Sequence, residues 1–529
     1  MRVNNIWIEK FRNLQDFSID FNHNTDLLKE NANTTVLIGR NGSGKSNLFE
    51  AIVLIFRDID LGARPSFSYE IDYTRKDTTT DEEQRIFIKA KHKEPNENNI
   101  YSITIDNRII DFSIFFKNRS IKYLPKNIFA YYSGRNQRLE SCFEIHQQRY
   151  KQNLSQSKAT PLRPLFYVKD EHSQFVLLSY FANDYEVEEV ESKGKRFLKK
   201  YLDIDGIDSV LFTIKLPKRK IKGDNYDSRG LKGDIADYID TIQNYSLAPI
   251  YDKNKNLLYL FIPNEEKFKE LALEFGNSIS VFKRLESIYL TKHLMKIDIL
   301  VKRRINDTST EVTLSALSEG EQQLLIVMGM LKLFEDKESL FLLDEPDTHL
   351  NPKWKMEYLK LLKEVVGEDV SSQLLINTHD PIVVSGLVKE QVRILSKEIF
   401  TGKITSQQPA TDPRGMGFSG LLTSELYGFR STLDLYTLDL LDEKRRISIK
   451  NRLSDDDRHR LSELNKILEE LDFTNYRDDA YRMFAYAFRE IERREEINNL
   501  ILTEEELDRR KQLAKDVYEI VQQLKVNGI

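Results

Sequence analysis

A glycine-rich segment near the start of the chain carries residue types that hold phosphate groups. Residues 39–46, GRNGSGKS, fit the pattern G-x-x-x-x-G-K-[ST], between the apolar run TTVLI and the segment SNLFEAIVLIF. This order predicts a strand, a loop and a helix, with backbone N–H groups and the positive helix end facing phosphate oxygens. Lys45 would reach the β and γ phosphates of ATP, and the Ser46 hydroxyl would bind Mg²⁺. The residues expected to contact the nucleotide are Gly39, Arg40, Asn41, Gly42, Ser43, Gly44, Lys45, Ser46 and Asn47.

Two acidic residues follow another apolar run, SLFLLDEP, far along the chain. Asp344 can hold the water shell of Mg²⁺, and Glu345 can orient and deprotonate the attacking water. Adjacent acids after a strand are often only a turn, but the complete phosphate loop favours catalysis. His379 ends the next apolar run, QLLINTHDP, where an imidazole could contact the γ phosphate. A structural histidine is the alternative.

A third segment, LSEGEQQLL, predicts a helix that begins after Ser318 and continues to Phe334. Ser318 and Glu321 have the spacing of a capping box, which by itself requires no further function. The segment lies far beyond Lys45 and shortly before the acidic run. That position gives the serine a second possible role, in binding a phosphate.

Hydrophobic periodicity predicts the elements that position these residues. The alternation in residues 3–21 predicts a strand pair that turns at Arg12 and Asn13. Residues 66–133, including NIFAYYSG, have a period of two and predict an antiparallel sheet region. SLFLLDEP and QLLINTHDP, joined by KWKMEYLKLLKEV, predict a βαβ unit with buried parallel strands. The expected fold class is therefore α/β.

These patterns divide the chain into four parts. We expect an N-terminal ATPase lobe at 1–134, a mixed α/β insert at 135–296, a C-terminal ATPase lobe at 297–400 and a helical partner-docking region at 401–529. In the last part, Thr503 and Glu506 have capping-box spacing. Two apolar stripes there fit either a subdomain that packs on itself or a surface for a partner. The stripes are Leu461, Leu464, Ile467, Leu468 and Leu471, and Leu513, Val517, Ile520, Val521 and Leu524.

The composition gives no overall basic field, because 529 residues with 31% charged side chains carry a net charge of -5. Nucleic-acid contact would therefore come from two basic clusters in the insert, at 193–200 and 215–222. Phe197, Tyr201 and Phe212 lie nearby and could stack bases, although Phe212 fits the core of a strand equally well. Solvated lysine-rich loops are the equal alternative.

The cysteine count and the hydropathy pattern indicate a cytoplasmic chain. Cys142 is the single cysteine, which excludes an intramolecular disulfide and fits a reducing compartment. No apolar run approaches the roughly 18 residues needed to span a bilayer. The first residues, MRVNNIWIEKFRNLQ, lack the apolar core of a signal peptide. We expect no association with a membrane.

As an ordered set, the motifs resemble those of ABC-type AAA ATPases related to the SMC, RecF and OLD proteins. The segments that carry this resemblance are IWIEKFRNL, GRNGSGKSN, LSEGEQQLL, LLDEPDTHLNP and INTHDP. The resemblance implies an ATP-sandwiched homodimer in which Ser318 and Gly320 reach the γ phosphate held by the other subunit. It also implies that Asp347 is the D-loop acid near the nucleotide and that Gln137 is a candidate Q-loop glutamine.

Other segments resemble the ATPases of bacterial anti-phage systems, namely Septu PtuA, including its retron-associated form, and restriction-system-associated AAA ATPases. These segments are LPKNIFAYYSGRNQRLE, PLFYVKDEHSQFVLL and TDPRGMGFSGLLTSELYGFRSTLD. The resemblance implies an ATPase subunit that works with a separate HNH nuclease, PtuB, and in retrons with a reverse transcriptase and its msDNA.

Three other functions are alternatives for a chain with these motifs. A DNA-repair ATPase of RecF or SMC type, which clamps DNA, is the main alternative. A transporter subunit is disfavoured by the large insert and the C-terminal helices. A nuclease would need the acidic pattern of the Toprim domain of OLD proteins; Asp203 and Asp205 spell Asp-x-Asp, but turn residues flank them, so we expect a surface loop there.

Overall fold

The chain forms two compact units, Met1–Phe429 and Arg430–Ile529. The computed structural model describes residues 1–22, 33–77, 82–92, 100–154, 163–182, 193–218, 230–231, 233–305, 308–334, 338–366, 372–398, 400–448, 450, 453–471, 512, 515 and 518. Within these residues, no helix has both the length and the apolar character needed to cross a bilayer.

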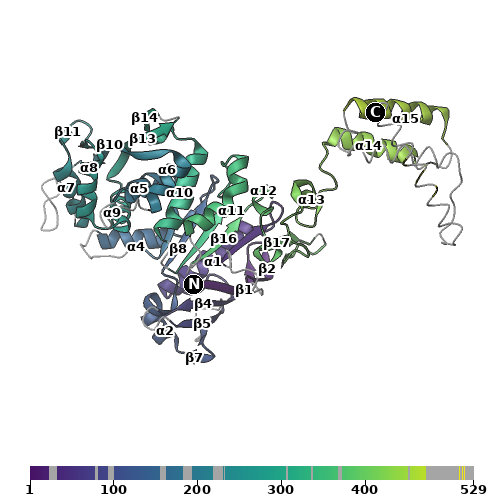
Figure 1. Cartoon of the computed structure of the whole chain (residues 1–529). Coiled ribbons are helices and arrows are strands. Elements are labelled where there is room, and N and C mark those ends of the chain that lie inside the picture. The colour runs from purple at the N-terminus through teal and green to yellow at the C-terminus, as the bar shows by residue number, and fades with distance from the viewer. Residues whose placement is uncertain are drawn as a thin grey trace. The chain divides into compact units, whose positions relative to one another are not determined.

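A seven-stranded sheet forms the centre of the first unit (Figure 1). Its strands are β3 (Thr34–Ile38), β8 (Asn127–Tyr132), β9 (Leu165–Val168), β15 (Ser339–Asp344), β16 (Gln373–Asn377), β17 (Val392–Lys397) and β18 (Ile404–Gln407). The order across the sheet is β18-β17-β3-β16-β15-β8-β9, and every pairing is parallel except that of the edge strand β18 with β17. This confirms the predicted α/β class and the predicted pair of buried parallel strands.

The position of β8 corrects one prediction. The period of two predicts that its sequence NIFAYY belongs to the antiparallel region, but the strand pairs in parallel with β15 and β9. Its first five residues are all buried, so the strand has no solvent-facing side. Phe129 packs into one hydrophobic core, whereas Ile128 and Ala130 pack into the other. A strand that is buried on both faces has no regular alternation of apolar and polar residues. The periodicity of its sequence therefore could not show to which sheet it belongs.

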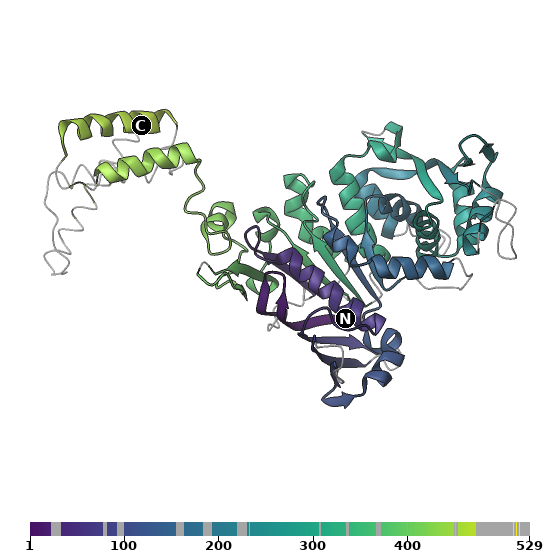
Figure 2. The same cartoon turned by 180° about the vertical axis from the view of Figure 1, so that it is seen from behind.

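An antiparallel sheet and helix α1 cover one face of the parallel sheet. The six strands are β1 (Arg2–Phe11), β2 (Leu14–Asp20), β4 (Tyr69–Lys76), β5 (Glu83–Ala90), β6 (Tyr101–Ile105) and β7 (Arg108–Ile110), in the order β2-β1-β4-β5-β6-β7. Helix α1 (Lys45–Leu61) is seen beside them in Figure 2, and its buried side chains join the same core. The predicted strand pair is confirmed, with Arg12 in the turn at a φ of 53°. Two short helical segments, α2 (Phe112–Asn118) and η2 (Arg119–Tyr123), follow β7.

Helices cover the opposite face of the parallel sheet. They include α5 (His172–Tyr180), α10 (Glu319–Leu333), α11 (Pro352–Val366) and α12 (Pro381–Val384). The ring of Phe129 in β8 lies 4.6 Å from that of Phe334 at the end of α10 and 5.0 Å from that of Phe341 in β15. The same unit contains the helices α3 (Arg138–Ser141), α4 (Glu144–Leu154) and α13 (Gly417–Thr423).

The middle of the chain builds a five-stranded sheet in the order β11-β12-β10-β13-β14. The strands are β10 (Ile204–Lys215), β11 (Ile250–Asp252), β12 (Leu257–Ile262), β13 (Leu294–Ile305) and β14 (Thr308–Thr313), and the helices are α6 (Lys193–Leu202), α7 (Asp234–Tyr245), α8 (Glu265–Phe275) and α9 (Ser278–Leu290). Its core is continuous with that of α5 and α10. The insert is therefore packed onto the lobe that contains the parallel sheet, and its own sheet continues past residue 296.

In the second unit, helices α14 (Leu435–Ser448) and α15 (Asp455–Glu470) pack against each other. Leu464 and Leu468 of the first apolar stripe are buried with Leu440 and Ile447. Most of that stripe therefore contributes to the internal core of this pair of helices, whereas Leu471 is exposed. The second stripe, at 513–524, and the capping box of Thr503 and Glu506 lie outside the described residues.

Candidate nucleotide-binding site

The predicted site residues lie on loops at one edge of the parallel sheet. The phosphate loop follows β3, Asp344 and Glu345 end β15, and His379 follows β16. Because β3, β16 and β15 are adjacent and parallel, their carboxyl ends meet at the same edge. Topology thus brings together segments more than 300 residues apart in the sequence, as the contact between Lys45 and His379 across 334 positions shows.

The phosphate loop has a backbone that depends on glycine. Gly39 has a φ of 152°, and a Cβ there would lie 2.2 Å from the Leu395 carbonyl oxygen, so no side chain fits. Gly44 has a φ of 93° at the start of α1. Asn13, in the β1–β2 turn, donates to the Gly42 carbonyl at 2.9 Å and braces the loop. The Ser43 hydroxyl is buried and has no hydrogen-bond partner among the described residues, so it is available to a ligand.

Lys45 lies at the base of this loop. Its Nζ donates to the Gly39 carbonyl at 2.6 Å and lies 3.5 Å from Nδ1 of His379. Burial lowers the pKa of Lys45 to about 8, although the nearby Asp344 and Glu345 oppose that shift. A phosphate oxygen would be a far stronger acceptor for this ammonium than the carbonyl it now contacts.

Asp344 and Ser46 supply the oxygen atoms suited to a divalent cation. Asp344 is 3% exposed and accepts a hydrogen bond from Nδ2 of Asn377 at 3.0 Å. Burial raises the pKa of Asp344, while hydrogen bonds from Ser46 and Asn377 oppose the rise. A carboxylate and a hydroxyl beside the phosphate loop match the hard oxygen ligands that Mg²⁺ prefers, so the residues fit the ion.

Glu345 and His379 form a pair at the mouth of the site. Oε1 of Glu345 lies 3.0 Å from Nε2 of His379, and both side chains are partly exposed. The hydrogen bond from His379 lowers the pKa of Glu345, which keeps that carboxylate ionised. With a proton on Nε2, the ring's Nδ1 is free to accept from Lys45. An ionised, accessible carboxylate is able to take a proton from water.

Ser318 caps helix α10 as predicted. Its hydroxyl accepts from the Glu321 N–H at 3.3 Å, and Glu321 accepts from the Ser318 N–H at 2.8 Å, so both halves of the capping box are present. A Cβ on Gly320 would lie 2.6 Å from the His349 carbonyl oxygen, so glycine lets the turn after β15 approach α10 closely. Within the described part of the chain, no hydrogen bond or ion pair joins Ser318 or Gly320 to the phosphate loop.

Asp347 is buried behind the acidic pair. It accepts a hydrogen bond from the Thr378 hydroxyl at 2.9 Å, and burial raises its pKa to about 6. In this chain, Asp347 therefore joins the turn after β15 to the end of β16.

Two buried residues on helices complete this region, and the sequence motifs predict a role for neither. Gln323 of α10 lies 3.3 Å from the Tyr131 hydroxyl and 3.5 Å from the Glu345 carbonyl oxygen. Its own carbonyl accepts from the His349 N–H at 2.9 Å, so α10 contacts the turn that holds Glu345. Glu50 of α1 is 2% exposed and forms ion pairs with Arg12 and Arg138. A glutamate inside the apolar run SNLFEAIVLIF was the signal that could have identified it.

The candidate Q-loop residue, Gln137, is exposed, and its neighbour Arg138 makes the contacts to α1. The Arg138 guanidinium donates to the side chains of Asn47 and Glu50. Asn47 in turn donates to Asn13. Asn47 therefore belongs to a side-chain network around the first turn of α1.

The basic insert is less available to nucleic acid than the sequence indicates. Lys195, Lys199 and Lys200 of α6 form ion pairs with Glu265, Asp205 and Glu364. Phe197 and Phe212 are buried in the core, so these two rings are not available to stack bases, and Phe212 takes its alternative place in a strand core. Most of the second cluster, at 219–222, lies outside the described residues.

The Asp-x-Asp sequence is only partly in a loop. Asp203 has a φ of 54° in a turn, while Asp205 already belongs to β10. Their carboxylates lie near Arg303 and Lys199, respectively.

Comparison with curated proteins finds retron and Septu relatives. The chain is 23% identical over 425 residues to "Retron Vc95 probable ATPase" of Vibrio cholerae serotype O1 biovar El Tor, which covers 74% of both chains. It is 23% identical over 437 residues to "Retron Ec83 probable ATPase" of Escherichia coli, covering 75% of this chain and 71% of that one. It is 28% identical over 205 residues to "Septu protein PtuA" of Bacillus mycoides (strain KBAB4). That match covers 37% of this chain and spans only 28% of PtuA.

Among solved structures, the SMC head domain of Thermotoga maritima is similar at a TM-score of 0.33 and 14% identity, covering 77% of this chain and 99% of that one. A family model described as "AAA domain, putative AbiEii toxin, Type IV TA system" matches residues 34–385. The match spans well over half of the chain and includes the phosphate loop, the acidic pair and His379. The predicted resemblance is confirmed, and the chain belongs to this family of AAA-domain proteins.

Proposed function

We propose that this chain is the ATP-binding and ATP-hydrolysing switch subunit of a bacterial anti-phage defence complex. The observation that carries the proposal is the meeting of Lys45, Asp344, Glu345 and His379 at one sheet edge. The names of the Septu and retron relatives support the defence setting.

Each side chain has a role that its geometry permits. Lys45 would bind the β and γ phosphates of ATP, and the phosphate loop's N–H groups would surround them. Ser46 and Asp344 would hold Mg²⁺, which when bound neutralises phosphate charge. Glu345 would take a proton from the attacking water, and His379 would orient Glu345 while facing the γ phosphate.

Hydrolysis would require two copies of the chain. Ser318 is exposed at the positive end of a 15-residue helix and contacts no residue of its own phosphate loop among those described. A helix end of this kind favours an anion, and the phosphate held by a second copy is such a group. ATP would then close the homodimer, and hydrolysis would reopen it.

The output of this cycle would be control of a separate HNH nuclease of the PtuB kind. A reverse transcriptase with its msDNA would join the complex in a retron setting. The helical region from residue 401 onward would dock the partner. The chain itself would not be the nuclease.

The test combines purification with activity. We expect Mg²⁺-dependent ATP hydrolysis, a dimeric mass only with a non-hydrolysable ATP analogue, and co-purification of an HNH nuclease encoded in a neighbouring reading frame. Absence of hydrolysis under all these conditions contradicts the enzymatic proposal. ATP-dependent DNA binding without any partner favours instead the RecF or SMC type of DNA clamp.

A further inference from the structure

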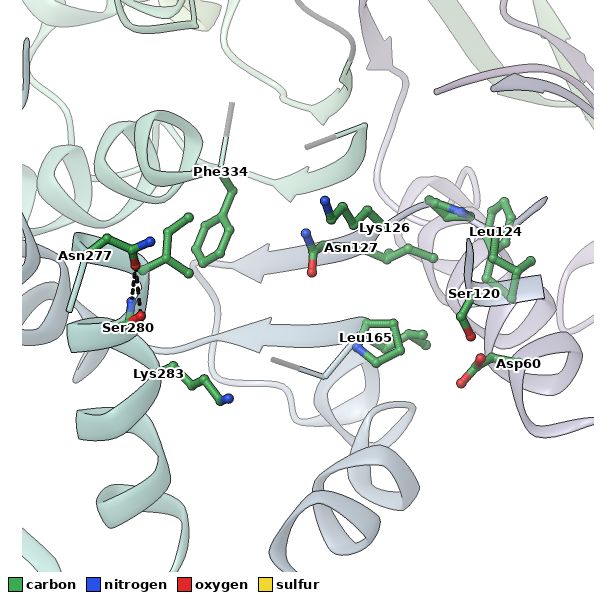
Figure 3. Close-up of a pocket in the computed structure, with 15 residues that line it drawn as sticks. Asp60, Ser120, Leu124, Lys126, Asn127, Leu165, Asn277, Ser280, Lys283 and Phe334 are labelled. Atoms are coloured by element: carbon green, nitrogen blue, oxygen red, sulfur yellow. Dashed lines mark hydrogen bonds between the residues drawn. The ribbon is translucent and has the colours of Figure 1, made fainter. Parts of the chain in front are cut away.

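A cavity of about 510 Å³ opens at the edge of the parallel sheet opposite the nucleotide site (Figure 3). It lies at the amino ends of β8 and β9, where Asn127 and Leu165 begin these strands. Residues of α1, α9 and the end of α10 complete the wall. The volume is within the range of about 300–1,000 Å³ that small-molecule sites occupy.

The cavity wall combines apolar surface with positive charge. Phe56, Phe334, Leu165 and Ile279 are among its apolar lining residues. Lys126 and Lys283 also line it, and neither forms an ion pair with any residue that the structure describes. The one acid among its described lining residues, Asp60, is engaged by His146 at 2.9 Å and by Arg119 at 3.2 Å. The cavity therefore presents two lysines that have no ion-pair partner among the described residues, beside apolar side chains. The charge of Asp234, which does not line the cavity, acts on Lys283 without forming an ion pair with it.

Asn127 adds a polar group with hydrogen-bonding capacity to spare. The residue is 6% exposed, and its Nδ2 makes one long bond, of 3.4 Å, to the Ser339 hydroxyl. Its carboxamide projects between the two strands into the cavity in Figure 3. An amide can pair with the polar edge of a base, apolar walls can cover the faces of its ring, and lysines can bind phosphate. These three features together match a nucleoside phosphate.

Three elements connect the nucleotide site to this cavity. One end of each element lies at the nucleotide site, and the other end lies at the cavity. Helix α1 begins at Lys45, and its residues Phe56 and Asp60 line the cavity. Helix α10 begins after Ser318, and Phe334 lies at its C-terminal end. Helices of 17 and 15 residues are rigid rods of about 25 Å and about 22 Å.

Strand β8 makes the third connection. It runs from Asn127 to Tyr132, and the N–H of the next residue, Ser133, donates to the Asp344 carbonyl at 3.3 Å. A ligand in the cavity would thus contact one end of α1, of α10 and of β8. The other ends of these elements lie at the phosphate loop, at Ser318 and beside Asp344, respectively.

We propose that this cavity is a second binding site, for a nucleoside monophosphate, and that its occupancy changes the rate of ATP turnover at the opposite edge of the sheet. The binding part of the proposal is independent of ATP hydrolysis. The regulatory part rests on the proposed function.

Binding is tested by calorimetric titration of AMP, GMP, CMP, UMP and inorganic phosphate into the full chain. A non-hydrolysable ATP analogue and Mg²⁺ saturate the phosphate loop, so that only the second site can respond. At least one monophosphate binds, and more tightly than inorganic phosphate. The Lys126→Glu/Lys283→Glu double variant binds it about 10-fold to 100-fold more weakly, because two charge-assisted contacts are lost.

The matched control is Lys253→Glu/Lys255→Glu, which makes the same charge change in the exposed turn between β11 and β12. This variant keeps the affinity of the wild type. Three results overturn the site: no monophosphate binds, inorganic phosphate binds as tightly, or the Lys126→Glu/Lys283→Glu variant binds unchanged.

A second variant removes the space rather than the charge. Ile279→Trp places a large ring into the cavity from a partly exposed position of α9 and abolishes binding. Its control, Leu273→Trp, alters an exposed site of α8 and preserves binding.

Regulation is then measured as ATP hydrolysis with and without the monophosphate. The rate changes in the wild type and in Leu273→Trp but not in Ile279→Trp. Monophosphate binding without any ATP hydrolysis contradicts the proposed function and leaves the cavity site standing. ATP hydrolysis without monophosphate binding contradicts the cavity site and leaves the proposed function standing.

Discussion

Nε2 of His379 lies 3.0 Å from Oε1 of Glu345, and Nδ1 of the same ring lies 3.5 Å from Nζ of Lys45. One imidazole thus connects the candidate base to the phosphate-binding lysine. Glu345 has a φ of 54°, and its N–H donates to the Asn377 carbonyl at 2.9 Å. A left-handed backbone at a non-glycine residue is held in place by such contacts and is common at functional sites.

Replacing Glu345 by glutamine separates nucleotide binding from hydrolysis. Glu345→Gln removes the proton acceptor but leaves Lys45, Ser46 and Asp344 intact, so ATP remains bound and the dimer stays closed. Hydrolysis falls by about 10²-fold to 10⁴-fold. Phosphate release and light-scattering mass measure the two effects, with Glu266→Gln, on exposed α8 surface, as the control. Normal turnover in Glu345→Gln is incompatible with its assignment as the base.

Removing His379 changes the pH dependence of hydrolysis. The hydrogen bond from His379 lowers the pKa of Glu345, so His379→Ala lets that pKa rise. A base must be ionised to act, and the acidic limb of the rate profile therefore moves to higher pH. Rates measured from about pH 4 to about pH 8 test this shift. His459→Ala, at an exposed position in α15, should leave the pH–rate profile unchanged. If the acidic limb of the profile does not move in His379→Ala, His379 does not lower the pKa of Glu345.

A bulky charge at Ser318 tests the contact between subunits. Ser318→Arg blocks the exposed start of α10, so hydrolysis is lost while each phosphate loop still binds ATP. The lost cap costs about 1 kcal/mol of stability, which leaves the chain folded. Ser315→Arg adds the same charge three positions earlier, at another exposed site, and should hydrolyse ATP normally. Equilibrium binding of a fluorescent ATP analogue and phosphate release distinguish the two variants.

The affinity for ATP should fall in mildly alkaline solution. Burial lowers the pKa of Lys45 to about 8, and only the protonated amine attracts phosphate. Above about pH 8 a proton must be taken up on binding, so affinity decreases by up to about tenfold per pH unit. Lys45→Arg keeps its charge across this range, and its affinity should change far less with pH. Fluorescent ATP titrations between about pH 7 and about pH 9.5 give the comparison.

The stability of the chain should depend on Asp347. Its folded pKa is raised to about 6 from an ordinary value of 3.8, so the folded state favours the protonated acid. This contribution to stability is present at low pH and is lost as pH rises from about 4 through about 6. Asp347→Asn mimics the protonated form and should gain melting temperature relative to the wild type as pH rises. A gap in Tm that is constant between about pH 4 and about pH 8 contradicts this.

Several elements were predictable because local chemistry alone specifies them. The phosphate loop needs glycines at defined positions. At Gly39 the reason is steric, because a Cβ there would clash with the Leu395 carbonyl oxygen. The capping box of Ser318 and Glu321 is a contact across three residues, so its spacing is sufficient to predict it. β15 and β16 are short apolar runs beside a helix, which is typical of buried parallel strands.

Other features were decided only by packing between distant segments. The sheet that β8 joins could not be predicted, because pairing with β15 and β9 involves residues far away in the sequence. Arg138 and Glu50 form an ion pair beside α1, and the sequence around neither residue predicts that contact. The cavity also depends on tertiary structure, since it forms where the ends of α1, β8, β9, α9 and α10 meet. The sequence by itself determined which side chains could bind phosphate and metal, because those chemistries require particular residue types at short spacing. The order of the parallel strands decided which of these side chains lie together in the folded chain. That order is set by pairing between strands that are far apart in the sequence, so no local pattern specifies it.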